Sequence, residues 1–306
     1  MDQIIKTIME GLIQGGKHVQ EINKVIPVKG ERYTLPLGGR DIDIVFYKAE
    51  EENRPLMIGL HGGGFVNGGS AIDDNQWCAL KETLNVNIAS VNYRMAPENK
   101  WPAAIYDAYE SAVYLKDHAE EFGFAKDCII IMGNSAGGNI AATTCIYAKQ
   151  KGADLFNGQI LFYPYLDLAS DPMSKGGSGI FSGPSLAAMN ALYADEENYS
   201  NSMLSPVCAD PEELEDLPPA IFCLGGADAL CPEAVRYSEM LKEVGVPVCL
   251  KIAEGMPHAF IENNYYDEIP EPMRDELTMR ILEDGSMAAA TTEALDFVRE
   301  NFGIFN

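Results

Sequence analysis

One stretch of the chain, residues 126–151, limits the possible fold more than any other. Residues 128–132 are apolar and β-branched, as in a buried strand, and residues 139–149 are small and apolar, as in a buried helix. Only the motif GNSAGG separates them. A strand that becomes a helix within so few residues holds one of them in a strained conformation, and flanking glycines leave room for the neighbouring backbone. We expect Ser135 to be that residue, with its hydroxyl above the sheet edge.

The motif G-x-S-x-G around Ser135 is short, so chance alone produces it in some chains and it is only suggestive by itself. A phosphate-binding loop before a helix is an alternative interpretation. No lysine follows these glycines, however, as it does in nucleotide-binding loops. A nucleophilic serine therefore needs support from other parts of the sequence.

The distribution of charge and cysteine argues against several classes of protein. A formal net charge of -24 repels nucleic acid and anionic membrane surfaces, although solubility alone is the simpler explanation of this acidity. Seven cysteines without C-x-x-C spacing argue against a disulfide framework or a zinc site and fit a reducing cytoplasm. No secretory signal or membrane-spanning apolar run is visible. We expect a cytoplasmic protein without metal or cofactor.

Strands and helices alternate along most of the chain. A hairpin is expected first, from residues 31–37 and 42–48. Further apolar strands are expected at residues 55–60, 85–93, 128–132, 159–163, 220–224 and 246–252, with helices at 101–122, 139–149, 232–244 and 288–301. This order predicts an α/β fold with a mostly parallel central sheet and helices on both faces. Ligands then bind beyond the carboxyl ends of the strands.

Two segments depart from this alternation. Residues 1–26 carry apolar residues three or four apart, interrupted at Gly15 and Gly16, which predicts two short amphipathic helices that pack on the core or cap a pocket. Residues 166–206 are rich in Gly, Ser, Asp and Met, and we interpret them as an insertion over the sheet edge. We expect an N-terminal segment at 1–30 and one catalytic domain at 31–306, with the insertion at about 166–206.

A serine hydroxyl needs a base to take its proton, and only four histidines are available. His18 and His118 are most simply exposed. His61, at a strand end, is either a base or a structural residue. His258 follows the carboxyl end of the last clear strand, where a base would stand.

The base needs an orienting acid, and Asp228 also follows a strand end. The chain order Ser135, Asp228, His258 is the order expected for an α/β-hydrolase. Glu233 is the alternative orienting acid.

A serine that attacks an acyl carbon also needs donors for the resulting oxyanion. Three successive glycines, 62–64, follow a buried strand and leave backbone N–H groups unhindered. We expect the N–H groups of Gly63, Gly64 and Ala136 to form the oxyanion hole.

The motifs HGGGF, YRMAPE, WPAAIYD, GNSAGG, GGADAL and PHAF occur in this order, and with them the chain resembles the hormone-sensitive-lipase-like branch of α/β-hydrolase esterases (esterase/lipase family IV) over residues 35–260. The resemblance implies cofactor-free hydrolysis of small-molecule esters with short to medium acyl chains. It implies a helical cap made from the N-terminal helices and the insertion. It assigns the triad and the oxyanion hole to the residues named above, and makes His61 a residue that shapes the glycine loop.

The chain departs from the family pattern at three places. Asn134 stands where the family usually has Asp or Thr, and Ala229 replaces a common Pro. The acidic stretch 261–285 is longer than expected, and a lid, a dimer contact and a disordered loop all stay open for it, as does a homodimer. A catalytically silent binding protein and an amidase are the alternative functions. Anionic acyl groups are expected to be poor substrates because of the chain's charge.

Overall fold

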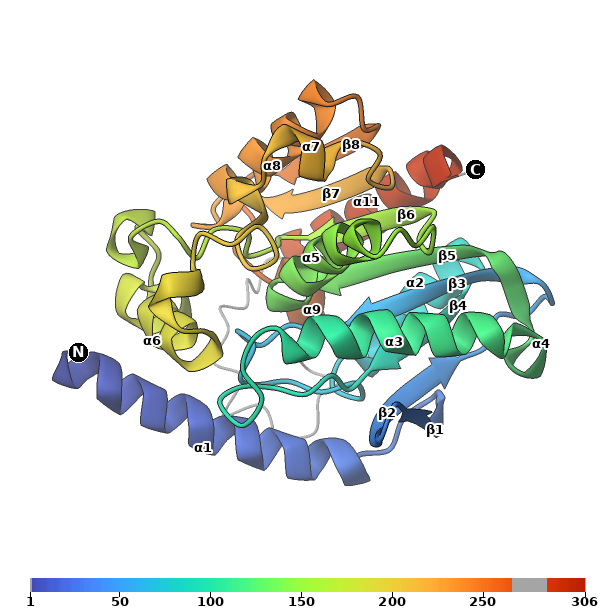
Figure 1. The fold of residues 1–306 in the computed structure, drawn as a ribbon, viewed down its shortest axis with the longest axis horizontal. Helices are drawn as coiled ribbons and strands as arrows, with labels where there is room; N and C mark the ends of the chain where they lie inside the picture. The colour runs from blue at the N-terminus through green and yellow to red at the C-terminus, as the bar shows by residue number, and fades with distance from the viewer. Residues whose placement is uncertain (1, 266–284, 306) are drawn as a thin grey trace.

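The computed structural model describes residues 2–265 and 285–305. Its centre is an eight-stranded sheet in the order β1-β2-β4-β3-β5-β6-β7-β8 (Figure 1). The strands are β1 (Glu31–Leu37), β2 (Arg40–Tyr47), β3 (Arg54–Leu60), β4 (Asn87–Val91), β5 (Phe124–Asn134), β6 (Gly158–Phe162), β7 (Ala220–Gly225) and β8 (Val248–Ala253). The predicted strands are all present, with shifted ends.

The first two strands form the predicted hairpin, in which Leu35 lies opposite Ile42. β2 also pairs antiparallel with β4, and every other pair in the sheet is parallel. The carboxyl ends of β3, β5, β7 and β8 therefore meet at one edge. The sequence prediction of a mostly parallel α/β sheet is confirmed.

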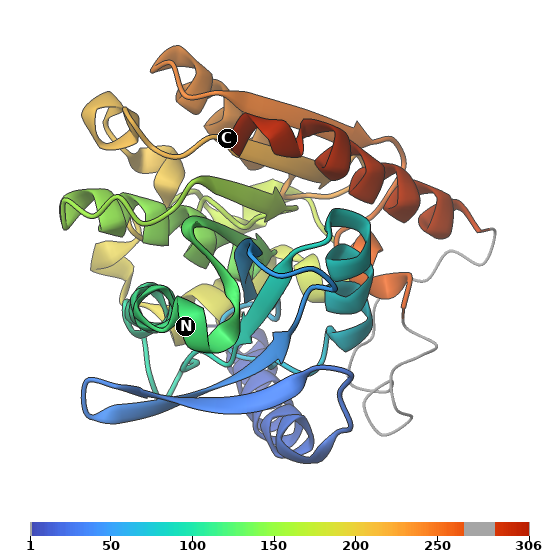
Figure 2. The same ribbon diagram turned by 90° about the vertical axis from the view of Figure 1, so that its right-hand side faces the viewer.

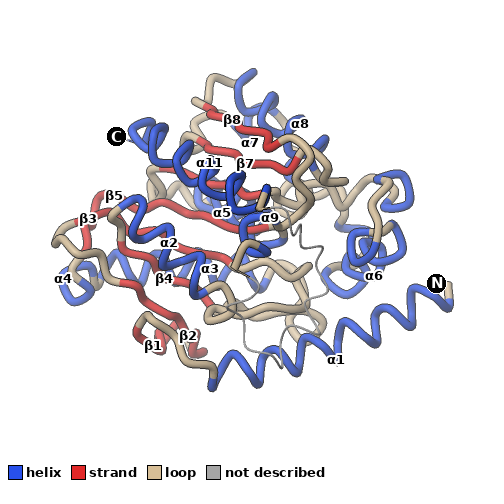
Figure 3. Tube along the Cα trace, turned by 180° about the vertical axis from the view of Figure 1, so that it is seen from behind, coloured by secondary structure: helices blue, strands red, loops and turns tan. Residues whose placement is uncertain are grey.

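Helices cover both faces of the sheet. α3 (Ala103–Asp117), α5 (Ala136–Gln150) and α8 (Cys231–Glu243) pack on one face, and α2 (Asp74–Leu84) and α11 (Ser286–Asn301) on the other (Figures 1 and 3). Alternation along β3 separates the two cores, since Leu56 and Ile58 join the first and Met57 joins the second. The predicted helix at 101–122 is divided at His118, after which the short α4 (Ala119–Phe122) begins.

The N-terminal segment differs from its prediction. It is one continuous helix, α1 (Gln3–Val25), and not two short ones. A Cβ on Gly16 would lie 2.1 Å from the carbonyl oxygen of Val66, so this glycine allows the helix to approach another backbone closely and does not break it. Figures 1 and 2 show α1 at the edge of the molecule, beside α6 (Gly183–Tyr193).

The predicted insertion holds α6 and three short 3₁₀ helices, at Pro172–Lys175, Gly179–Phe181 and Glu196–Asn198, and a fourth, Pro206–Cys208, begins at its last residue. α7 (Pro211–Leu214) precedes β7, α9 (Phe260–Asn263) follows the β8 loop, and a 3₁₀ helix, Phe302–Phe305, ends the described chain. Most of the acidic stretch 261–285, namely residues 266–284, lies outside the described residues. Within the described part, no helix is both long enough and apolar enough to span a bilayer.

Candidate active site

The turn between β5 and α5 holds Ser135 as expected. Its backbone has φ 53° and ψ -114°, a sparsely populated conformation for a residue with a side chain. Its N–H donates to the carbonyl of Phe162 at 2.9 Å, which ties the turn to β6. A Cβ on Gly133 would lie 2.1 Å from the Gly137 carbonyl oxygen, and a Cβ on Gly137 would lie 2.1 Å from that of Leu60. The glycines are therefore required by close backbone packing.

The structure brings Ser135, His258 and Asp228 together, although they lie far apart in the chain. His258 Nε2 is 2.8 Å from Ser135 Oγ, and His258 Nδ1 is 2.6 Å from Asp228 Oδ2. An ionised carboxylate can only accept, so Nδ1 carries the proton and Nε2 is left to accept the proton of the serine hydroxyl. The second oxygen of Asp228 accepts from the Leu230 N–H at 2.9 Å, which fixes the carboxylate.

The loop after β3 lies beside the same serine. Gly63 and Gly64 have φ of 113° and 61°, a region that favours glycine. Among the described residues, no hydrogen bond is donated by the backbone N–H of Gly63, Gly64 or Ala136. Ala136 is the first residue of α5, where the helix dipole adds positive potential. These three groups are thus available to an oxyanion.

His61 is placed differently from His258. Its ring stacks on Tyr93 with centroids 4.2 Å apart, and its Nδ1 donates to the Gly62 carbonyl at 2.8 Å. Burial lowers the pKa of His61 to about 4. Of the other histidines, His18 is exposed, as expected, whereas His118 is half-buried and stacks on Tyr114.

Comparison with known proteins places this geometry in a family. Residues 57–262, more than half of the chain, match the model of an alpha/beta hydrolase fold family. The chain belongs to this family. The resemblance to its hormone-sensitive-lipase-like branch is confirmed.

Several relatives of this hydrolase carry the name esterase. An arylesterase of Saccharolobus solfataricus is 33% identical over 76% of this chain and 75% of its own. The esterase LipI of Mycobacterium tuberculosis is 31% identical over 69% of this chain and 67% of its own. A hyperthermophilic esterase of the archaeon Pyrobaculum calidifontis superposes with a TM-score of 0.77 at 28% identity, over 99% of this chain and 92% of that one.

The hydrolase carries Asn134 beside its nucleophile, and the structure gives this departure a physical reason. The amides of Asn134 and Gln76 form two reciprocal hydrogen bonds, of 2.7 and 3.1 Å. Asp73 and Glu262 stand next to this pair. Burial raises the pKa of Asp73 to about 7, and burial with the nearby charge of Asp73 raises the pKa of Glu262. A neutral amide at position 134 avoids a third carboxylate here.

Glu233, the alternative orienting acid, has other partners in the hydrolase. Its Oε1 accepts from the N–H groups of Leu166 at 2.6 Å and Asp167 at 3.1 Å, and its Oε2 pairs with Lys175. Burial raises the pKa of Glu233 to about 7, although Lys175 opposes this shift. Glu233 thus connects the cap insertion to α8, and Asp228 is the acid at His258.

A cavity of about 150 Å³ adjoins Ser135 and the glycine loop. Its remaining wall is largely apolar and includes Leu12, Tyr165, Phe181, Leu186 and Met189, with Asp73 and Glu262 at one side. Of the large apolar side chains in the insertion, Phe181 and Met189 line this cavity. Met173 is half exposed, Leu192 is buried in the core, and Tyr193 stacks on Phe65.

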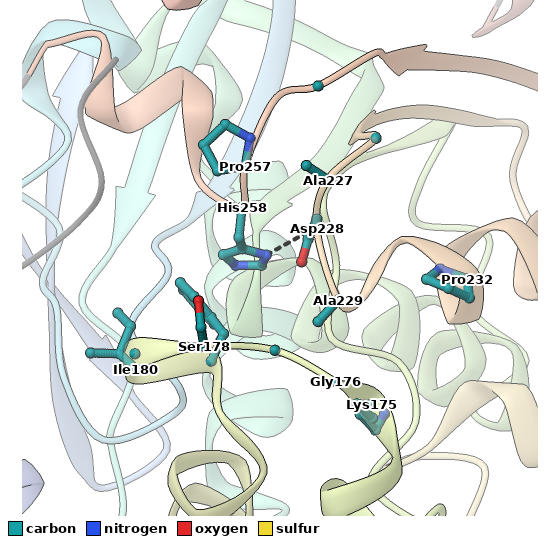
Figure 4. Close-up of a pocket in the computed structure, with 15 residues that line it drawn as sticks. Lys175, Gly176, Ser178, Ile180, Ala227, Asp228, Ala229, Pro232, Pro257 and His258 are labelled. Carbon is teal, nitrogen blue, oxygen red and sulfur yellow. Dashed lines mark hydrogen bonds and ion pairs between the residues drawn. The ribbon is translucent and has the colours of Figure 1, made fainter. Parts of the chain in front are cut away.

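A second, larger cavity of about 560 Å³ lies on the other side of His258 and Asp228. Figure 4 shows its walls, with Ser178 and Ile180 of the cap facing the loops that carry the two triad residues. The ring of Phe181 packs on His258 with centroids 4.1 Å apart and thereby separates the two cavities.

The sequence alone did not indicate Asp73, Gln76 or Glu262 at this site. Their only signal is position, since Asp73 immediately precedes α2, Gln76 lies in its first turn, and Glu262 follows His258 by four residues. Acidic residues are too frequent in this chain for that to stand out. Across the residues that the structure covers, no group of His, Cys, Asp or Glu side chains is arranged to hold a metal ion.

Proposed function

We propose that this hydrolase is a serine carboxylesterase that cleaves small-molecule esters with short to medium acyl chains through an acyl-enzyme on Ser135. The observation that carries the proposal is the contact of His258 Nε2 with Ser135 Oγ at 2.8 Å, with Asp228 on the opposite nitrogen. Acyl transfer to serine requires a nucleophile, a base and an orienting acid that are hydrogen-bonded in series.

In the first half-reaction, His258 takes the hydroxyl proton while Ser135 Oγ attacks the ester carbonyl. The negative charge that develops on the carbonyl oxygen is held by the N–H groups of Gly63, Gly64 and Ala136. His258 then gives its proton to the departing alcohol, and Asp228 stabilises the imidazolium between these steps. In the second half-reaction, water takes the place of the alcohol and releases the acid.

By its family, the chain is a carboxylic ester hydrolase, since several relatives carry the names arylesterase, esterase, carboxylic ester hydrolase and carboxylesterase. The small apolar cavity at Ser135 supports short to medium acyl chains. The segments 1–30 and 166–206 are proposed as its cap, because Leu12, Phe181 and Met189 line that cavity.

The cellular compartment and the oligomeric state of the protein are proposals. All seven cysteines are free, which supports a reducing compartment such as the cytoplasm. A homodimer stays a prediction, to be tested by light scattering of the purified protein.

The direct test is hydrolysis of p-nitrophenyl acetate and butyrate. We expect a burst of p-nitrophenol, labelling of Ser135 by a fluorophosphonate, and loss of both in Ser135→Ala. Ser200→Ala, an exposed serine that lines neither cavity, is the matched control and should keep both. Full turnover in Ser135→Ala would refute the mechanism, whereas a wild-type protein that neither turns over nor is labelled would indicate a silent binding protein. A faster matched anilide would indicate an amidase.

A further inference from the structure

The loop after β3, which carries the proposed oxyanion donors, folds back and hydrogen-bonds to itself. The Gly63 carbonyl accepts from the N–H groups of Val66 at 3.2 Å and Asn67 at 2.9 Å. A Cβ on Gly63 would lie 2.1 Å from the Asn67 carbonyl oxygen, so the two arms of the loop touch. The direction of the Gly63 and Gly64 N–H groups therefore depends on where residues 66–71, the returning arm, are held.

Helix α1 holds the returning arm. Gln20 Nε2 donates to the Gly68 carbonyl at 2.7 Å, and Asn23 Oδ1 accepts from the Ala71 N–H at 2.8 Å. Gly16 packs directly on the Val66 carbonyl, as described above. Asn23 is only 2% exposed, although it lies in the N-terminal helix. A buried amide is costly unless its hydrogen bonds are made, so these contacts fix the geometry of the arm.

The same amides are also tied to the sheet. Asn23 Nδ2 donates to Asn92 Oδ1 at 3.2 Å, and Asn92 Nδ2 donates to Gln20 Oε1 at 3.5 Å. Asn92 follows the end of β4, and its N–H donates to the Asp43 carbonyl of β2 at 2.9 Å. Three amide side chains, of which Asn23 is buried and Gln20 and Asn92 are half-buried, thus link α1, the returning arm and the sheet.

We propose that Asn23 and Gln20 are positioning residues for the oxyanion hole. α1 then does more than cap the pocket, because it fixes the loop whose N–H groups receive the charge of the transition state. The inference rests on the proposed esterase function. Since these donors act on charge that develops after binding, disturbing them lowers kcat and leaves KM nearly unchanged.

The test is steady-state hydrolysis of p-nitrophenyl butyrate by Asn23→Ala and Gln20→Ala. We expect kcat to fall about 10- to 100-fold in Asn23→Ala and about 3- to 10-fold in Gln20→Ala, with KM within about threefold of wild type. Asn23→Asp keeps the acceptor for the Ala71 N–H and should recover most of the loss. Gln20 is half-buried, so we expect Gln20→Ala to fold. This variant therefore tests the proposal even where Asn23→Ala fails to fold.

Asn87→Ala is the matched control. Asn87 is also a fully buried amide that accepts from a backbone N–H, that of Ala49 at 3.0 Å, but it lies at the amino end of β4, away from the glycine loop. It should lower the melting temperature as Asn23→Ala does and leave kcat unchanged. An equal fall of kcat in Asn87→Ala, or kcat within twofold of wild type in both Asn23→Ala and Gln20→Ala, would overturn the inference.

Inhibition by a trifluoromethyl ketone gives a second readout, because its adduct with serine places an oxyanion in the hole. Its Ki should rise in Asn23→Ala by about the factor by which kcat/KM falls. An unchanged Ki would contradict the positioning role. A wild-type protein without esterase activity would instead refute the proposed function, so the two failures are distinguishable.

Discussion

His61 and His258 both follow strands of one sheet at the same edge, and both are buried, yet their rings make different contacts. His258 lies between a carboxylate and a hydroxyl, whereas His61 lies on Tyr93 and donates to the backbone. Burial lowers the pKa of His61, which favours its neutral form, and we propose that it supports the glycine loop. The partners of a ring, and not its position at a strand end, decide whether it can act as a base.

The largest expected effect separates the two histidines directly. His258→Ala should lower kcat by about four to six orders of magnitude, because the base is lost. His61→Ala should lower it by only about 10- to 100-fold, through displacement of the glycine loop. Both are measured with p-nitrophenyl butyrate, and equal losses would mean that the two rings are not functionally distinct.

The next test compares the two acids considered as the orienting acid of His258, Asp228 and Glu233. Asp228→Asn should lower kcat by about 10⁴-fold, because the amide favours the wrong tautomer of His258. Glu233→Gln removes the alternative acid, which accepts from the Leu166 N–H and pairs with the Lys175 side chain, and should change kcat only a few-fold. A larger loss in Glu233→Gln than in Asp228→Asn would reverse the assignment.

Discrimination against charged substrates should show a smaller effect. Asp73, whose pKa is about 7, and Glu262 line the cavity at Ser135, so at pH 8 a succinyl ester should react at least about 10-fold more slowly than a butyryl ester. The double variant Asp73→Asn, Glu262→Gln should reduce this ratio. A wild-type preference for the succinyl ester would contradict the expectation drawn from the chain's charge.

The smallest expected effects are changes of folding stability with pH. They have opposite signs for His61 and Asp73. The folded pKa of His61, about 4, is below its ordinary 6.5, so its contribution to stability is present above pH 6.5 and is lost as pH falls to 4. The folded pKa of Asp73, about 7, is above its ordinary 3.8, so its contribution is present below pH 3.8 and is lost as pH rises through 7.

Urea unfolding between pH 4 and 7.5 checks these signs. Relative to wild type, His61→Gln should lose stability less steeply on acidification, and Asp73→Asn should lose less on alkalinisation. Shifts of the same sign in both variants would show that these groups do not titrate as their burial implies.

The sequence predicted most of the sheet and of the candidate site because both follow local rules. Apolar β-branched runs indicate strands, and glycines around Ser135 indicate a tight turn, so the residues at strand ends could be expected to meet. The continuity of α1 could not be predicted, because glycine in a helical pattern usually indicates a break. Only the structure shows that Gly16 packs against Val66 within a continuous helix. The Asn134–Gln76 pair and the contacts of Gln20 and Asn23 with the glycine loop could not be predicted either. These contacts join segments that are brought together only by tertiary packing.

The glycine packing around Ser135 has a consequence for how such a protein can change over generations. Gly133 and Gly137 touch other backbone so closely that any side chain would displace the nucleophile, which leaves this part almost no freedom to vary. The pocket wall is built instead from cap side chains such as Phe181 and Met189, whose replacement leaves the turn intact. New substrate preferences can therefore accumulate through drift in the cap while the reaction itself is inherited unchanged.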